Sequence, residues 1–136
     1  MVKVIMGVKG TGKTKSIIDL VKKAADEEQG DVICLEKDSV LTYDIPYKVR
    51  LITASSYGFG SYEFLQGFIS GLHAGNYDIT HIFIDGLLKI VHESPDARVE
   101  AFLDWCEAFS ERENVKFTIS ISSSEDLVTE GIRKYL

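Results

Sequence analysis

The chain has 136 residues, enough for one domain with a sizeable hydrophobic core and too few for two. Apolar residues make up 45% and charged residues 26%, as in ordinary globular proteins, and no apolar run approaches the roughly 18 residues of a membrane span. The net charge of −6 is a poor match to DNA or RNA, which requires a basic stripe on the protein, so we expect no nucleic-acid partner.

The first residues and the cysteines indicate a cytoplasmic protein. The opening MVKVIMG lacks the long apolar region and the small-residue cleavage site of a signal peptide. Cys34 and Cys106 lie among apolar neighbours, which favours buried thiols in a reducing compartment over a disulfide or a metal site.

Short apolar strands alternate with amphipathic helices along the chain. The patterns predict strands over 2–6, 31–37, 48–54, 77–85 and 115–122, and helices over 13–28, 61–75 and 94–112, with a short helix over 123–136. Ser61 and Ser94 are the expected N-caps, and Gly30 is the expected end of the first helix. Strands rich in isoleucine and valine between amphipathic helices indicate an α/β fold, in which a mostly parallel five-stranded sheet is covered by helices on both faces.

The positive charge gathers at the start of the chain. Residues 1–23 contain six lysines and one aspartate, a balance of +5, so the remainder carries −11. A local basic pole suits a small polyanion such as a nucleotide. Solvated lysines on the outer face of a helix are the alternative, and they account for Lys22 and Lys23.

Residues 7–14, GVKGTGKT, match the P-loop pattern G-x-x-x-x-G-K-[ST] between a predicted strand and a predicted helix. The glycines allow successive backbone N–H groups to curl around phosphate oxygens, and the helix start adds its positive dipole end. Lys13 is expected on the β- and γ-phosphates, and the Thr14 hydroxyl on Mg²⁺. The predicted nucleotide-binding residues are Gly7, Val8, Lys9, Gly10, Thr11, Gly12, Lys13, Thr14 and Lys15. Residues 1–136 are then one domain with a three-layer α/β/α P-loop NTPase fold.

A second element of such a site is an acid at the end of another parallel strand. HIFID, residues 81–85, fits this Walker B pattern, so Asp85 and Thr14 are the predicted Mg²⁺ ligands. An ordinary strand that ends in a turn-forming Asp-Gly is the alternative. Many P-loop ATPases carry a water-polarising glutamate directly after the aspartate, and Gly86 excludes that arrangement here.

Some P-loop ATPases carry this glutamate at the end of the strand that follows the P-loop helix, where this chain has Glu36. At this point the sequence resembles the RecA-like family of KaiC-type and replicative-helicase ATPases, since GVKGTGKT, VICLEKD, THIFIDGLLKI and NVKFTISISSS occur in that family's order and spacing. The resemblance implies catalytic roles for Lys13 and Glu36 and a γ-phosphate sensor at Ser122 or Ser123. Small bacterial proteins of this type are sometimes labelled PilT-like, a label that a shared P-loop explains without a role in motility.

Other P-loop classes are disfavoured by motifs that the sequence lacks. The guanine-reading motif of GTPases does not occur, and two cysteines cannot supply the zinc-binding set of thymidine kinases. The arginines are too widely separated for the lid of a small-molecule kinase; they are Arg50, Arg98, Arg112 and Arg133.

We therefore expect an ATP-binding protein that is a slow or partner-dependent Mg-ATPase. A nucleotide-binding switch or interaction module without significant turnover is the alternative. P-loop enzymes often need an arginine from a partner to compensate the transition-state charge. Arg133 and Lys134, at the basic end of the last predicted helix, are the candidates to reach a neighbouring subunit, so we expect self-association or an unidentified protein partner.

Overall fold

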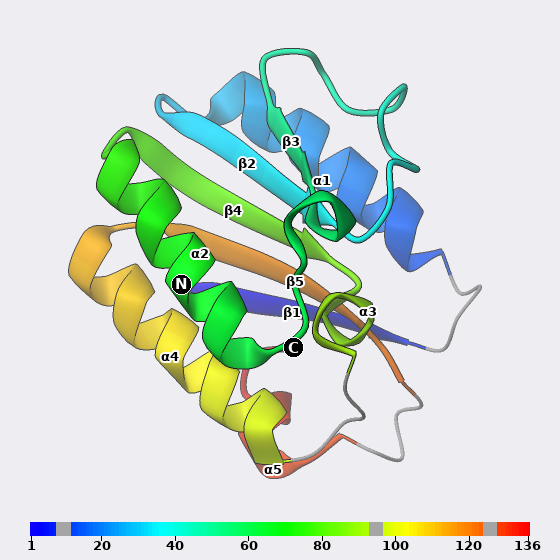
Figure 1. Cartoon of the computed structure of the whole chain (residues 1–136), viewed down its shortest axis with the longest axis vertical. Coiled ribbons are helices and arrows are strands. Elements are labelled where there is room, and N and C mark those ends of the chain that lie inside the picture. Colours follow the sequence, from blue (N-terminus) through cyan, green and yellow to red (C-terminus); the bar gives the residue numbers. More distant parts are fainter. Residues whose placement is uncertain (8–11, 93–96, 124–127) are drawn as a thin grey trace.

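In the computed structural model of the chain, the described residues are 1–7, 12–92, 97–123 and 128–136. They form a five-stranded sheet in the order β1-β5-β4-β2-β3, in which every pairing is parallel (Figure 1). The strands are β1 (Val2–Gly7), β2 (Asp31–Glu36), β3 (Arg50–Thr53), β4 (Ile79–Asp85) and β5 (Lys116–Ser122). The expected α/β fold with five strands is confirmed, and its sheet is entirely rather than mostly parallel.

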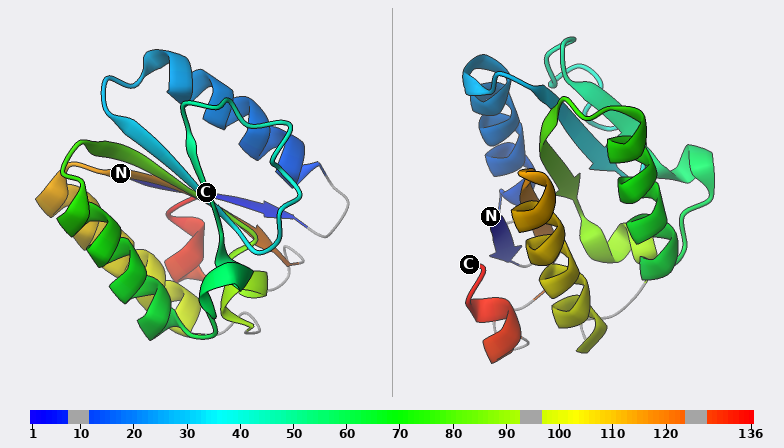
Figure 2. Two further views of the ribbon diagram at one scale, coloured as in Figure 1. Left: turned by 45° about the horizontal axis from the view of Figure 1, so that its top comes forward. Right: turned by 90° about the vertical axis from the view of Figure 1, so that its left-hand side faces the viewer.

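Helices cover both faces of this sheet. They are α1 (Lys13–Glu27), α2 (Tyr62–Gly75), α3 (Leu87–Val91), α4 (Ala97–Glu113) and α5 (Glu130–Arg133), with a short 3₁₀ turn, η1 (Ala54–Tyr57). Figure 2 shows α1 on one face of the sheet and α2 beside α4 on the other. In the part of the chain that the structure describes, no helix is long and apolar enough to cross a membrane.

Each face of the sheet has its own hydrophobic cluster. The larger cluster joins α2 and α4 to the sheet, and the smaller one joins α1 to β2, β4 and the connection between β2 and β3. Phe117, Ile119 and Ile121 of β5 belong to the larger cluster. Because side chains alternate along a strand, Ser120 and Ser122 lie on the α1 face of β5. This alternation places hydroxyl groups beside the helix that follows β1.

Several local predictions are confirmed. The Ser61 hydroxyl accepts a hydrogen bond from the Phe64 N–H at 3.0 Å, as an N-cap should. Cys34 and Cys106 are free and buried, and burial raises the pKa of both thiols. Ser94, which was predicted to cap α4, lies outside the described residues.

Other predictions need correction. Among the described residues of 123–136, the last helix spans only Glu130–Arg133, because the Thr129 hydroxyl accepts from the Ile132 N–H and caps the helix there. Helix α1 ends at Glu27, before Gly30. Gly30 serves a close approach instead, since a Cβ at this position would lie 2.2 Å from the Asp78 carbonyl oxygen. Helix α3 was not predicted.

Candidate functional site

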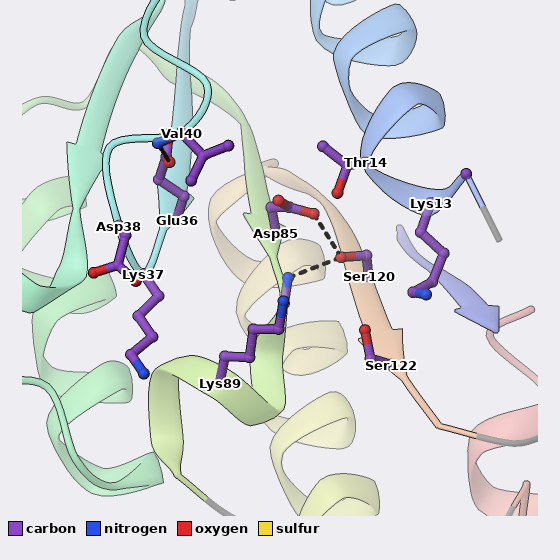
Figure 3. A pocket seen from close by; sticks show the side chains of 12 residues that line it. Lys13, Thr14, Glu36, Lys37, Asp38, Val40, Asp85, Lys89, Ser120 and Ser122 are labelled. Carbon is purple, nitrogen blue, oxygen red and sulfur yellow. Dashed lines mark hydrogen bonds between the residues drawn. The ribbon is translucent and has the colours of Figure 1, made fainter. Parts of the chain in front are cut away.

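The carboxyl ends of all five strands meet at one edge of the sheet, because the strands are parallel. A pocket of about 380 Å³ opens at this edge, within the range of ligand sites (Figure 3). It lies between the start of α1, the ends of β2, β4 and β5, and the start of α3. The lining residues are Gly12, Lys13, Thr14, Glu36, Lys37, Asp38, Val40, Asp85, Gly86, Lys89, Ser120 and Ser122.

The start of α1 contributes three of the residues that were predicted to bind nucleotide. Gly12 is the N-cap, with φ 85° and ψ 15°, a left-handed conformation that favours glycine. Lys13 is 9% exposed, and the first turn brings Thr14 to the same pocket.

The remaining predicted nucleotide-binding residues have different placements. Gly7 ends β1, and its carbonyl oxygen accepts from the Ser123 N–H at 3.0 Å. Lys15 is exposed on α1 and does not line the pocket. The other four lie outside the described residues; they are Val8, Lys9, Gly10 and Thr11.

The Lys13 ammonium is held at an electrostatic cost. Burial lowers its pKa, the nearby Lys89 ammonium lowers it further, and the Asp85 carboxylate acts in the opposite direction. An anion bound between the two lysines would relieve this cost, since it would replace repulsion with attraction.

A hydrogen-bonded unit fixes Asp85 at the end of β4. The Ser120 hydroxyl donates to Asp85 Oδ1 at 2.9 Å and accepts from the Gly86 N–H at 2.8 Å (Figure 3). Ser120 is 1% exposed, so its hydroxyl is buried between these two partners. Asp85, which lines the pocket, is thereby held through its Oδ1 atom.

Thr14 and Asp85 could together hold a divalent cation. Figure 3 shows the Thr14 hydroxyl and the Asp85 carboxylate turned toward the same space. These are the hard oxygen donors that Mg²⁺ prefers. No group of three or more His, Cys, Asp or Glu side chains that could hold a metal occurs among the described residues. The donors fit Mg²⁺ that keeps water and shares phosphate oxygens, rather than a site made by protein alone.

Glu36 lies at the end of β2, paired in register with Asp85, and is 3% exposed. Its Oε1 accepts from the Val40 N–H at 2.6 Å and from the Leu41 N–H at 3.2 Å, and its Oε2 lies 3.3 Å from the same Leu41 nitrogen. Burial raises its pKa, the two backbone N–H groups oppose the rise, and the Asp85 carboxylate adds to it. Glu36 therefore lines the pocket and also holds the turn after β2 in place.

The two serines predicted as γ-phosphate sensors, one at the end of β5 and one directly after it, differ in placement. Ser122 lines the pocket, whereas Ser123 is 9% exposed and is not among the lining residues. Ser120 was not predicted as a site residue, although the alternation in KFTISIS places it on the same face as Ser122. The sequence pattern alone does not show which residue Ser120 meets. The register of β4 and β5 pairs Ile84 with Ile119 and so brings Ser120 beside Asp85.

Two lysines of the pocket were also missed. Lys37 directly follows β2, and Lys89 lies in the first turn of α3. A lysine soon after a strand end, as in LEKD and DGLLK, was the available signal. Together with Lys13 they bring three ammonium groups to the pocket of a chain whose net charge is −6.

No protein-family model and no curated protein matches the chain.

Proposed function

We propose that this protein binds Mg-ATP in the pocket at the carboxyl edge of the sheet, as a P-loop protein of RecA-like type. The observation that carries the proposal is the convergence of Gly12, Lys13 and Thr14 with Asp85 on one pocket. Two motifs that are distant in the sequence meet where open α/β sheets bind their ligands, outside the carboxyl ends of the strands.

The phosphate groups would lie against the start of α1. The helix is 15 residues long, and its N-terminal N–H groups and dipole favour an anion there. Lys13 would place its charge on the β- and γ-phosphates. Because Lys13 is desolvated and close to Lys89, its attraction for an anion is stronger than that of an exposed lysine.

The cation would lie between Thr14 and Asp85. When bound there, Mg²⁺ would neutralise phosphate charge and act as a Lewis acid on the γ-phosphoryl group. The role of Ser120 is to keep Asp85 in a fixed rotamer, so that the carboxylate needs no reorganisation when the cation arrives.

We propose slow or partner-dependent hydrolysis as the activity, with Glu36 orienting the attacking water. A switch without significant turnover is a second candidate, and a specific observation favours it. The carboxylate of Glu36 accepts hydrogen bonds from the N–H groups of Val40 and Leu41, so part of its hydrogen-bonding capacity is committed to the turn.

Thermal unfolding with and without Mg-ATP tests the binding. A ligand that binds only the native state adds about 2.7 kcal/mol at a hundredfold excess over Kd. For a chain of 136 residues this corresponds to a rise in Tm of roughly 9 °C. Lys13→Ala should remove most of this shift, and Asp85→Asn should weaken its dependence on Mg²⁺.

Lys22→Ala is the matched control, because Lys22 is an exposed lysine of α1 that does not line the pocket. It should keep the full shift. The absence of any shift of the wild-type protein with millimolar Mg-ATP or Mg-GTP would contradict the proposal. Phosphate release, measured on the same samples, separates the ATPase from the switch.

A further inference from the structure

Lys89 is held over the end of β4 by the geometry of the first turn of α3. The backbone N–H of Lys89 donates to the Gly86 carbonyl oxygen at 3.0 Å. Gly86 has φ 79°, and a Cβ there would lie only 3.4 Å from Cδ of Lys89. The methylene groups of Lys89 therefore pack over the glycine, and the side chain turns back toward Asp85.

Figure 3 shows Lys13 and Lys89 on different sides of Ser120, from α1 and from α3. Both side chains line the same pocket. The two ammonium groups therefore approach the pocket from two sides. This arrangement suits an anion that carries negative charge on both sides of the bond that breaks, as a triphosphate does.

Lys89 is available for a ligand. Within the ranges that the structure describes, no carboxylate lies within 4.0 Å of the Lys89 ammonium, and no arginine lines the pocket. By contrast, Arg133 lies 3.9 Å from Glu130, and Lys134 lies 3.2 Å from Asp104, outside the pocket. Arg133 and Lys134, the candidates to reach a neighbouring subunit, therefore lie in exposed ion pairs at α5 and α4, away from this pocket.

We propose that Lys89 supplies, from within the same chain, the positive charge that an arginine finger supplies in other P-loop enzymes. This assignment rests on the proposed function. In the step concerned, a water oxygen forms a bond to the γ-phosphorus as the bond from that phosphorus to the β,γ-bridging oxygen breaks. The bonding pair stays on ADP, and the water proton passes to solvent. Lys89 stabilises the charge that develops on the transferring group.

Three variants and one control test this assignment, by phosphate release and by the Mg-ATP thermal shift. Lys89→Gln should lower kcat about 10²- to 10³-fold, the loss expected for one preorganised donor to a transition state, and should change the thermal shift and KM by much less. Lys89→Arg should restore most of kcat, since it returns the charge. Lys37→Gln, at the other pocket lysine, should have the smaller effect on kcat. The exposed Lys22→Gln should change neither quantity.

Protein concentration provides the second arm of the experiment. If the cation comes from the same chain, specific activity stays constant over a hundredfold dilution. Activity that rises faster than linearly with concentration, or a wild-type kcat in Lys89→Gln, would overturn the assignment while the thermal shift still supported Mg-ATP binding. A wild type that binds Mg-ATP and releases no phosphate would overturn it as well. Loss of the thermal shift in the wild type itself would instead reject the proposed function.

Discussion

Replacement of Ser120 by alanine removes one oxygen that serves two partners at once. The Ser120 hydroxyl accepts from the Gly86 N–H and donates to Asp85 Oδ1, at 2.8 and 2.9 Å. Alanine fits the space, so the variant should fold without a steric clash. The change therefore isolates the two hydrogen bonds.

The expected loss of stability follows from the burial of each partner. Gly86 is buried, and its N–H would be left without an acceptor, which costs about 1–3 kcal/mol. Asp85 is only half-buried and faces the pocket, so water can replace the lost donor at little cost. We expect a loss of about 2 kcal/mol in the free energy of unfolding, or a fall in Tm of roughly 7 °C for a domain of this size.

Urea unfolding at pH 7 measures the first value, and a thermal scan the second. Ser122→Ala is the matched control, since Ser122 lies on the same face of β5 but is partly exposed, and it should change stability by less than about 0.5 kcal/mol. Equal stability of the wild type and Ser120→Ala would contradict this expectation, because it would mean that the Gly86 N–H finds another acceptor or that Asp85 is not oriented by this serine. With Mg-ATP, Ser120→Ala should also show a weaker dependence on Mg²⁺.

Two predictions concern pH. Burial lowers the pKa of His81 in β4 to about 4, so the folded state favours the neutral imidazole. The free energy of unfolding should therefore be highest above the ordinary histidine pKa of about 6.5 and should fall by roughly 3 kcal/mol toward pH 4. Urea unfolding measures this fall. His81→Gln should flatten this dependence, and an equal acid loss in both proteins would exclude His81 as its source. The pKa of Glu36 is raised, so the folded state favours the protonated carboxyl group. As the pH rises from the ordinary pKa of glutamate through the raised pKa of Glu36, the wild type should therefore lose stability relative to Glu36→Gln. If Glu36 orients water, the same variant should bind Mg-ATP without releasing phosphate, whereas wild-type turnover would remove it from the mechanism.

The regular part of the fold could be predicted because its signals are local. Runs of Ile and Val alternate with helical periodicity, and the end of β4 at Asp85 follows directly from HIFID. Helix α3 escaped prediction because five residues are too few for a periodic pattern. Because Lys89 belongs to α3, the position of this helix decides where Lys89 lies, and neither was predicted.

The contacts within the site depended on information that no single segment contains. Ser120 meets Asp85 because β5 lies between β1 and β4, and this strand order is set by the packing of the whole chain. Glu36 could be placed at the end of β2 from sequence, but its partners are the backbone N–H groups of an irregular turn, which has no pattern to read. Residue types and strand ends were predictable, whereas the hydrogen bonds between them were not.

If the pocket binds Mg-ATP as proposed, its charges predict that the metal-bound nucleotide binds better than either component alone. Its lining brings three lysines and three acids together, and the pKa of Lys13 is lowered while that of Glu36 is raised. Burial thus disfavours the charged forms of both Lys13 and Glu36. Phosphate alone would relieve the lysines but approach Asp85 with like charge, and Mg²⁺ alone would do the reverse. Mg-ATP would place negative charge near the lysines and positive charge near the acids. Mg²⁺ and ATP should therefore each raise the affinity of the pocket for the other.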